Sequence, residues 1–471
     1  MYKYLSTLGL LCICIMPYVY GQQVLTLDKV RQLAIATNED LKIASMQKEK
    51  AQSQQAIART YRLPAFSASG TTAIYQSENI EMELILPTKT PNLVTGELEP
   101  NILLHPQTGQ PVVDPDGNPL FNMYAWLPLE VNMQGAYLLG VTATQPLFAG
   151  GRINAGNRMA NIGVSMASEN IRLQRMNVIA EADNAYWTFV SVTQKVVLAD
   201  LAVEMLAEFV RLAENSYQVG MVSRNDVLKA QVEHNNAILD LKTARNGHEL
   251  SRINLCRIVG LPFDTQIMTE DTIIEINQTV PDALYAFELN QRPEYRLLEK
   301  NIELSEQNIR LARAEFLPEA GVQFGYNHIG GIEIGPDNFS NTSFNVMGSI
   351  RIPIFQWGQG ANKISSARID MEMRKVELER NRKLMQLEVE QSRLNMLLAR
   401  ERIEMNKFAL DQAAENLRMI RDSYQLGRET MTDLILAQTQ WQQAYSELID
   451  ANANFRLTET AWLKAIGRLG E

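Results

Sequence analysis

Cysteine is almost absent from this sequence of 471 residues, which contains three. Cys12 and Cys14 lie in an N-terminal stretch with the features of a removed leader, which leaves Cys256 as the single thiol of the mature chain. One thiol cannot form an intrachain disulfide, so stability has to come from packing or from assembly.

Long hydrophobic runs are also missing. After the N-terminal stretch, no run of about 18 or more uncharged apolar residues occurs, which excludes a membrane-spanning helix. The net charge of −10 argues against a nucleic-acid partner.

Residues that carry chemistry are few and scattered. The four histidines, His105, His234, His248 and His328, show no metal-ligand spacing. No glycine-rich loop followed by Lys and Ser or Thr is present to hold a phosphate. We therefore expect no catalytic, cofactor-binding or metal-binding site, no enzyme activity, and an energy source in a partner protein.

The N-terminus has the pattern of a secretory signal. Lys3 supplies the basic start, residues 5–16 form an apolar core, and residues 19–21 form a small-residue cleavage site. This pattern predicts a cleaved signal peptide over residues 1–21; a buried N-terminal helix is the alternative.

The sequence contains an internal duplication. At an offset of 207 residues, the segment that begins at Pro146 aligns with the one that begins at Pro353, and Tyr217-Gln-Val-Gly aligns with Tyr424-Gln-Leu-Gly. At an offset of 254 residues, Leu63-Pro64 aligns with Leu317-Pro318. The offsets differ by 47 residues, so the first copy carries about that much extra before Pro146. We expect repeats over 22–260 and 282–471, joined by a linker over 261–281.

Helical patterns bounded by Pro and Gly dominate both copies. The expected helices cover residues 28–62, 152–217 and 223–259 in the first copy, and 282–316, 359–424 and 430–466 in the second. The long helices, of about 100 Å at 1.5 Å per residue, need lateral neighbours. Their apolar residues fall on more than one stripe, as in a cylinder of helices, whereas a simple two-stranded coil predicts one seam.

Four segments have the alternating apolar and polar residues of β-strands. They cover about residues 65–75, 135–145, 320–327 and 343–352. Their length of about ten residues is typical of outer-membrane barrels; a short soluble sheet is the alternative. Four strands cannot close a barrel, and open edges in lipid leave costly unpaired backbone groups. Strands that enter a membrane must therefore share a barrel with other chains.

Proline marks the expected strand–helix junctions, because it lacks the N–H that a central strand position uses. These residues are Pro64, Pro146, Pro318 and Pro353. The first connection between strands, about 76–133, carries the insertion and is rich in Pro and turn residues, which predicts a long external loop.

The ordered residues resemble the TolC-like outer-membrane efflux channel family over about 24–468. The resemblance is carried by the two Leu-Pro pairs, by Pro146-Leu-Phe-Ala-Gly-Gly with Pro353-Ile-Phe-Gln-Trp-Gly, and by the Tyr-Gln-x-Gly turns. An Asp follows each turn six residues later.

The resemblance implies a mainly α fold with a small membrane β-barrel part. Duplicated helical hairpins would form a periplasmic α-barrel, and the four strands of each protomer in a homotrimer would contribute to a shared 12-stranded barrel. The barrel would lie in the Gram-negative outer membrane. Such a duct exports drugs, toxins, metals or proteins together with a periplasmic adaptor and an inner-membrane pump.

The resemblance also implies a gate at the helix tips. Asp433 matches a ring aspartate, Asn225 and Asp226 match positions that receive polar links, and Tyr424 matches a link-making tyrosine. Two departures, Glu429 in place of a linking arginine and Leu436 in place of a second ring aspartate, predict a different lock. The tips expected to dock the adaptor include Tyr217, Gly220, Gly427 and Arg428.

Other interpretations of these residues and of the whole chain stay open. Ser223-x-x-Asp226 and Thr430-x-x-Asp433 both have the pattern of helix capping boxes, and the two tyrosines could simply pack between hairpins. For the chain as a whole, the alternatives are a type I protein-secretion duct of the same fold and, in a different class, a soluble periplasmic coiled-coil tether.

Overall fold

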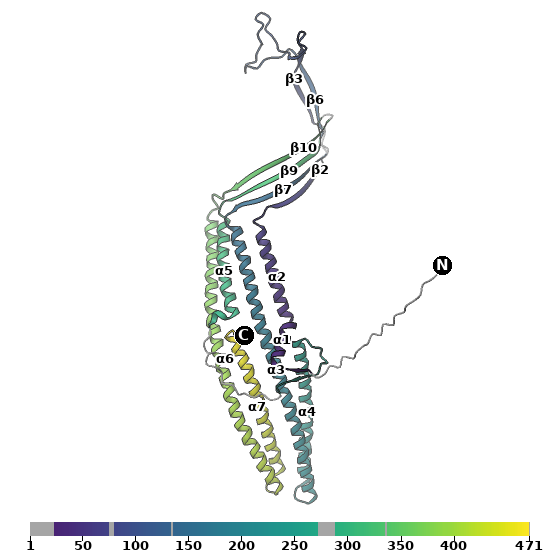
Figure 1. Cartoon of the computed structure of the whole chain (residues 1–471), viewed down its shortest axis with the longest axis vertical. Coiled ribbons are helices and arrows are strands. Elements are labelled where there is room, and N and C mark those ends of the chain that lie inside the picture. The colour runs from purple at the N-terminus through teal and green to yellow at the C-terminus, as the bar shows by residue number, and fades with distance from the viewer. Residues whose placement is uncertain (1–22, 75–79, 133–134, 272–287, 335–336, 471) are drawn as a thin grey trace, which may run out of the picture. The chain divides into compact units, whose positions relative to one another are not determined.

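The computed structural model describes residues 23–74, 80–132, 135–271, 288–334 and 337–470 (Figure 1). The expected signal peptide lies outside these residues, as do residues 272–281 of the expected linker and the start of the helix expected over 282–316.

Two compact units are present, and each contains corresponding parts of both sequence copies. The helical unit comprises Met1–Gln55, Arg158–Ile309 and Ser365–Glu471. The strand unit comprises Ala56–Asn157 and Arg310–Ile364.

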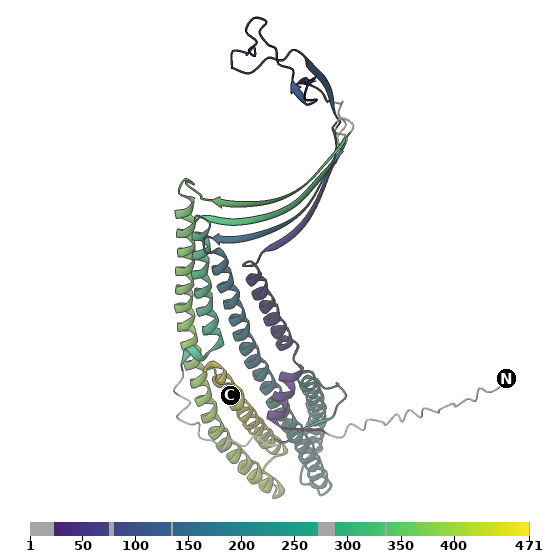
Figure 2. The same ribbon diagram turned by 45° about the horizontal axis from the view of Figure 1, so that its top comes forward.

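Four antiparallel strands form the main part of the sheet in the strand unit. They curve together in Figure 2 and lie in the order β2 (Ala65–Ile74), β7 (Gly135–Ala149), β9 (Glu319–Ile334) and β10 (Asp337–Arg351). β7, β9 and the start of β10 extend beyond the ranges that alternation predicts. The reason is pairing, because β9 is held by neighbours on both sides.

The first connection contains secondary structure of its own, whereas the sequence predicts a long loop there. β6 (Tyr124–Asn132) pairs with the end of β9 and with β3 (Ile80–Pro87). Between these strands, β4 (Lys89–Pro91) pairs with β5 (Leu98–Pro100).

The register of the strands repeats the duplication. Ala65 lies opposite Thr144 and Ile74 opposite Gly135. Shifted by the two sequence offsets, these pairs become Glu319 opposite Arg351 and His328 opposite Thr342, which are the pairs found between β9 and β10. The two copies therefore build the same strand pair.

Three of the four prolines lie at ends of strands, and one does not. Pro64 and Pro318 directly precede β2 and β9, and Pro353 follows the end of β10. Pro146 lies inside β7, so its assignment as a junction is wrong. The register shifts between Pro146 and Phe148, and such an irregularity accommodates a residue that lacks an N–H.

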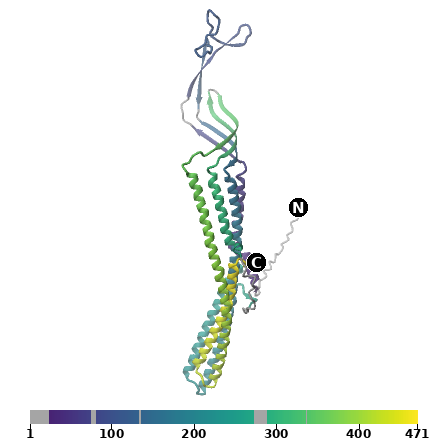
Figure 3. The ribbon, with the colours of Figure 1, turned by 90° about the vertical axis from the view of Figure 1, so that its left-hand side faces the viewer.

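Two helix hairpins form most of the helical unit (Figure 3). The first consists of α3 (Arg152–Gln218) and α4 (Arg224–Val259), and the second of α6 (Gln359–Gln425) and α7 (Met431–Ala465). The starts of α3 and α6 belong to the strand unit. Among the described residues, no helix combines the length and apolar character needed to cross a bilayer.

The helix expected over 28–62 is interrupted. It consists of α1 (Leu27–Thr37) and α2 (Glu39–Thr60), with Asn38 extended between them. The Asn38 side chain accepts a hydrogen bond from the Leu41 N–H at 2.9 Å, as an N-cap does. In the second copy, a short 3-10 helix η2 (Leu289–Gln291) precedes α5 (Pro293–Ala314), which begins at a proline.

α6 carries two apolar seams with spacings of three and four residues. The buried seam faces the rest of the chain and comprises Met385, Val389, Met396, Ala399, Leu417 and Tyr424. The second seam is exposed and comprises Leu384, Leu387, Leu394, Leu398, Met405, Phe408, Met419 and Leu426. Met396 and Leu398 differ by two residues, or about 200° of helix rotation, so the seams lie on nearly opposite sides.

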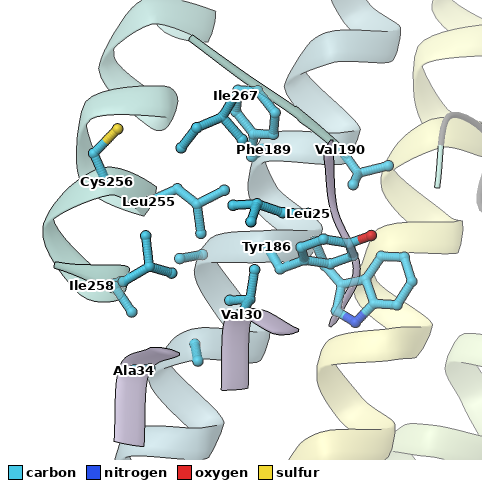
Figure 4. Close-up of a cluster of buried hydrophobic side chains, with 14 of the residues drawn as sticks. Leu25, Val30, Ala34, Tyr186, Phe189, Val190, Leu255, Cys256, Ile258 and Ile267 are labelled. Atoms are coloured by element: carbon cyan, nitrogen blue, oxygen red, sulfur yellow. The ribbon is translucent and has the colours of Figure 1, made fainter. Parts of the chain in front are cut away.

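A hydrophobic cluster joins the N-terminal and inter-repeat segments to α3 and α4 (Figure 4). β1 (Gln23–Leu25) pairs in parallel with β8 (Ile267–Thr269). Leu25 and Ile267 pack with buried side chains of both helices, among them Tyr186, Phe189 and Leu255. The Tyr186 hydroxyl also donates a hydrogen bond to Asp271.

A buried carboxylate ties three helices of the helical unit together. Asp183 on α3 has no exposed surface. Arg31 on α1 donates two hydrogen bonds to its carboxylate at 2.6 and 2.7 Å, and the Thr460 hydroxyl on α7 donates a third at 2.9 Å. The ion pair also raises the pKa of Arg31, so the guanidinium stays charged.

We expect Arg31→Ala to destabilise the protein more than Thr460→Val. The first change leaves a buried carboxylate without its counter-charge, at a cost of about 3 kcal/mol. The second deletes one hydrogen bond to a charge, at a cost of about 1 to 2 kcal/mol. Thermal unfolding of detergent-extracted protein, followed by far-UV circular dichroism, compares them; equal losses would contradict the counter-charge role of Arg31.

Candidate functional site

The tips of the two helix hairpins have the same backbone structure. Gly220 and Gly427 adopt left-handed conformations, with φ of 78° and 69°. Each glycine N–H donates to the carbonyl of the tyrosine three residues earlier, Tyr217 or Tyr424. Glycine at this position ends a helix without strain. The predicted turn glycines are therefore found where the chain reverses.

Both tip aspartates form capping boxes. The Ser223 hydroxyl accepts from the Asp226 N–H, and the Asp226 carboxylate accepts from the Ser223 N–H at 3.2 Å. Thr430 and Asp433 repeat these bonds at the start of α7. Asp226 and Asp433 are thus both helix-capping residues in the single chain, as the pattern of the sequence predicts.

Capping sets the ionisation of the tip. The hydrogen bond from the Ser223 hydroxyl lowers the pKa of Asp226, and that from Thr430 lowers the pKa of Asp433. A carboxyl with a lowered pKa stabilises the fold above its unfolded pKa, and that stabilisation is lost as the pH falls through the folded value. Both groups therefore carry negative charge at neutral pH.

The two tip tyrosines differ in their surroundings. Tyr424 is buried in a cluster that joins both hairpins and includes Phe209, Met431 and Leu434, whereas Tyr217 is exposed. Burial, followed by the charge of Asp226, raises the pKa of Tyr424. Its hydroxyl has no hydrogen bond of good geometry within the described part of the chain, although the Ser216 side chain lies near it and opposes the rise in pKa. The packing interpretation therefore describes Tyr424.

Polar contacts also join the hairpins, through residues that the sequence analysis does not identify. Lys229 donates to the Thr432 hydroxyl at 3.0 Å and lies 3.7 Å from Asp226. The Arg421 guanidinium donates a hydrogen bond to the Glu208 carboxylate at 2.6 Å. The spacing of three residues between Asp226 and Lys229 is a sequence signal for an ion pair on one helix. No sequence pattern indicates that Arg421 pairs with Glu208 of the other repeat.

The remaining predicted gate residues lie at the surface of the tips. Arg428 and Glu429 are exposed in the second turn, and Leu436 is exposed on α7. Asn225 helps to line a groove of about 440 Å³ between α4 and α7, with Leu228, Lys229, Val232, Glu233, Thr432 and Ile435.

The sheet of the strand unit has one apolar and one polar face. The registers of β2, β7, β9 and β10 align exposed apolar side chains on one face, namely Phe66, Leu139, Val141, Phe324, Tyr326, Phe344, Val346 and Ile350. The other face carries Ser67, Ser69, Thr71, Thr142, Thr144, Gln323, Asn327, Asn345 and Ser349.

Glycine makes room for amides on the polar face. A Cβ at Gly140 would lie 2.5 Å from Oδ1 of Asn327, and Gly325 lies beneath Asn345 in the same way. The hydroxyls of Ser67 and Thr142 are hydrogen-bonded across the strands at 2.7 Å. This face is therefore rich in hydrogen-bonding groups, although Leu138 and Met347 also lie on it.

Comparison with known proteins identifies the family. The sequence matches the family described as outer membrane efflux protein over residues 30–261 and 284–468. The chain belongs to this family. It is an outer-membrane exit duct of efflux or secretion systems, and the family consists of channels rather than enzymes.

Individual relatives support the same fold. The outer membrane efflux protein BepC of Brucella suis is 22% identical over 334 residues, which cover 70% of this chain and 72% of the relative. The alkaline protease secretion protein AprF of Pseudomonas aeruginosa is 22% identical over 339 residues, 70% of this chain and 68% of the relative.

Among solved structures, the CmeC outer membrane channel of Campylobacter jejuni matches with a TM-score of 0.70 at 17% identity, over 94% of this chain and 85% of that one. The outer membrane protein VceC of Vibrio cholerae matches with a TM-score of 0.69 at 16% identity, over 94% and 96%.

Membership of this family sets aside the soluble tether, because the family consists of outer-membrane channels. The tips, the sheet and their symmetry are then parts of an export channel, and their detailed roles are open to experiment.

We expect Tyr424→Phe to leave the stability of the channel nearly unchanged, because the removed hydroxyl has no hydrogen bond of good geometry. Tyr424→Ala should cost about 3 to 5 kcal/mol through the cavity that it leaves. Tyr217→Ala, at an exposed tyrosine in the same position of the other copy, is the matched control and should cost little. Thermal unfolding in detergent measures all three; a loss in Tyr424→Phe as large as in Tyr424→Ala would reject packing as the role of Tyr424.

Proposed function

We propose that three copies of this chain form a passive duct through the outer membrane, in which they share a 12-stranded barrel continued by a periplasmic tunnel of helices. The observation that carries the proposal is the part of the sheet formed by β2, β7, β9 and β10. It has one apolar and one polar face, and the outer sides of β2 and β10 have no partner among the described strands. An apolar outer face and a polar inner face suit lipid and a water-filled pore. Unpaired edges in lipid would leave backbone groups unsatisfied, so each sheet needs further copies.

The helices support the same assembly. The exposed seam of α6 contains three pairs of residues seven positions apart, and it has no partner within the described residues; the pairs are Leu387 with Leu394, Leu398 with Met405, and Met419 with Leu426. A seam with this repeat suits a neighbouring helix. With a second neighbour on this seam, α6 would be packed on both sides. A closed cylinder of helices has this arrangement, which the two apolar stripes in the sequence predict.

The hairpin tips suit a periplasmic adaptor. Tyr217, Val219, Met221 and Leu426 are exposed at the tips, with the charged Arg428 beside them. Exposed apolar side chains gathered in one region commonly mark an interaction site. The adaptor and an inner-membrane pump would supply the energy, because a passive duct has no energy source of its own.

The cargo that we propose is small molecules such as drugs, toxins or metals, the cargo that the family resemblance implies; the relative BepC is named as an outer membrane efflux protein. A type I protein-secretion duct is the second candidate, since the relative AprF is named for alkaline protease secretion. The inner-membrane pump that co-purifies with the channel separates the two, because drug pumps and protein-secretion ATPases are different proteins.

The sheet assignment predicts a difference between two neighbouring residues of β10. Val346 and Met347 are similarly exposed, at 56% and 54%, but lie on opposite faces. Val346→Arg puts a charge on the lipid side and should impair insertion by about 2–4 kcal/mol near the midplane. Met347→Arg faces the pore and should insert normally. The amount of protein in the isolated outer membrane measures this, and equal loss in both variants would contradict the assignment of the faces.

The gate assignment predicts a change in ion selectivity. Three copies of Asp433 around a threefold axis would make an acidic ring, which favours cations and binds multivalent ones. Asp433→Asn keeps the shape and part of the cap but removes the charge. We expect weaker cation selectivity and relief of block by trivalent cations in planar bilayers.

Asp226→Asn is the matched control for this experiment, because Asp226 has the same capping role in the first hairpin and is not the ring aspartate. Because Asp226 matches a link position of the gate, its change can alter how readily the channel opens, but the cation selectivity of the open channel should stay unchanged. Normal selectivity and block in an assembled Asp433→Asn channel would reject the ring and leave Asp433 as a helix cap.

A further inference from the structure

The two edges of the sheet lack the features that prevent strands from pairing. β2 contains no charged residue and no proline, and β10 has charges only at its two ends, Asp337 and Arg351. Each edge strand pairs with one neighbour among the described strands, β2 with β7 and β10 with β9. Natural edges are usually protected by charge, proline or a bulge. These edges are therefore suited to pairing with each other, in different copies of the chain.

The structure contains a template for that contact. β7 of the first sequence copy pairs with β9 of the second, with Thr142 opposite Gly325 and Leu139 opposite His328. β10 is the repeat of β7 at the offset of 207 residues, and β9 is the repeat of β2 at the offset of 254 residues. When both offsets are applied to the contact of β7 with β9, they give a contact of β10 with the β2 of another chain. Thr142 becomes Ser349, and Gly325 becomes Thr71.

The end of β10 differs from the end of β7, the strand that it repeats. β7 continues past Thr144 to Ala149, and over this stretch it pairs with β9 alone. β10 stops at Arg351, the residue that repeats Thr144. The residues after Arg351 repeat the end of β7, which in the first sequence repeat pairs only with β9 of the second repeat. In β10 these residues are exposed, including Ile354 at 94% and Phe355 at 69%.

We propose that β10 of each copy pairs with β2 of the next copy, with Ser349 opposite Thr71, and that the strand then continues through residues 352–356. This inference rests on the shared barrel proposed above and gives its register. The same offsets place Val346 beside Ile74 and Ile350 beside Gly70 on the apolar face.

The pairing keeps every side chain on its own face. Met347 and Arg351 then lie opposite Ala73 and Ser69 on the polar face. A shift by one residue would set apolar-face residues against polar-face ones along the whole seam, which makes this register specific.

Exposed apolar side chains at the helix end of the seam fit the same contact. Phe355 repeats Phe148, which pairs with Ala320, so it would reach Phe66 of the next copy. Trp357 stands where the first copy has Gly150 and has the unusual φ of 50° for a tryptophan. A Cβ at Gly150 would clash with the carbonyl oxygen of Ala314. The contact is therefore not copied unchanged at Trp357, whose side chain would lie over the exposed Leu63 only if the two chains are further apart there.

Disulfide cross-linking tests the register. Residues directly opposite in an antiparallel pair have Cα atoms about 4.5–5.5 Å apart, within reach of a disulfide. The pair Ser349→Cys with Thr71→Cys should form covalent dimers and trimers on oxidation, reversed by reductant, on a non-reducing gel. Arg351→Cys with Ser69→Cys, the next pair on the same face, should do the same and serves if the first variant fails to assemble. Cys256 is buried and can stay.

Two controls flank this test. Ser349→Cys with Ser67→Cys uses the same face but a position four residues, or about 13 Å, along the strand, and it should not cross-link. Thr144→Cys with Gln323→Cys repeats the Arg351 and Ser69 contact inside one chain, and it should form a disulfide without any increase in mass.

The outcomes separate this inference from the proposed function. Cross-linking through Ser67 in place of Thr71 overturns the register. A particle of three copies in which neither the Thr71 nor the Ser69 pair cross-links, although the intrachain control does, overturns the β10–β2 contact and leaves the trimeric duct standing. A particle that contains one copy overturns both.

Discussion

Backbone hydrogen bonding at the edges of a sheet is the constraint on which the rest of this structure depends. One chain supplies four strands, and the outer sides of β2 and β10 are unpaired among the described strands. In lipid no water can satisfy these groups. In the proposed barrel the chain therefore needs further copies, and the duplication provides a contact, β7 with β9, that would be repeated between chains until the barrel closes.

The helices meet a related constraint with side chains. A helix of 67 residues such as α6 cannot be stable alone and needs neighbours along its length. One seam of α6 is covered within the chain and the other is exposed. The buried pair of Asp183 and Arg31 and the cluster around Leu25 fix the N-terminal segment to both hairpins within one chain.

Much of this architecture follows from local signals in the sequence. Glycine at the two turns, proline before β2 and β9, and period-two alternation specify elements through short-range sterics and burial. Three features do not follow in this way. Pro146 enters a strand because β9 holds that segment, and Asn38 interrupts a helix through its own cap. The hairpin of β3 and β6 forms through the pairing of its own strands and joins β9 only at the end of β6. At the tips, spacing predicts the capping boxes of Asp226 and Asp433, but the burial of Tyr424 depends on contacts between the two hairpins.

Electron microscopy of the protein extracted from outer membranes and held in lipid nanodiscs tests the central claim most directly. The account predicts three copies around a threefold axis, one closed barrel of strands, and β10 of each copy beside β2 of the next. A particle with one copy, or one in which each sheet keeps two open edges in the lipid, would contradict it.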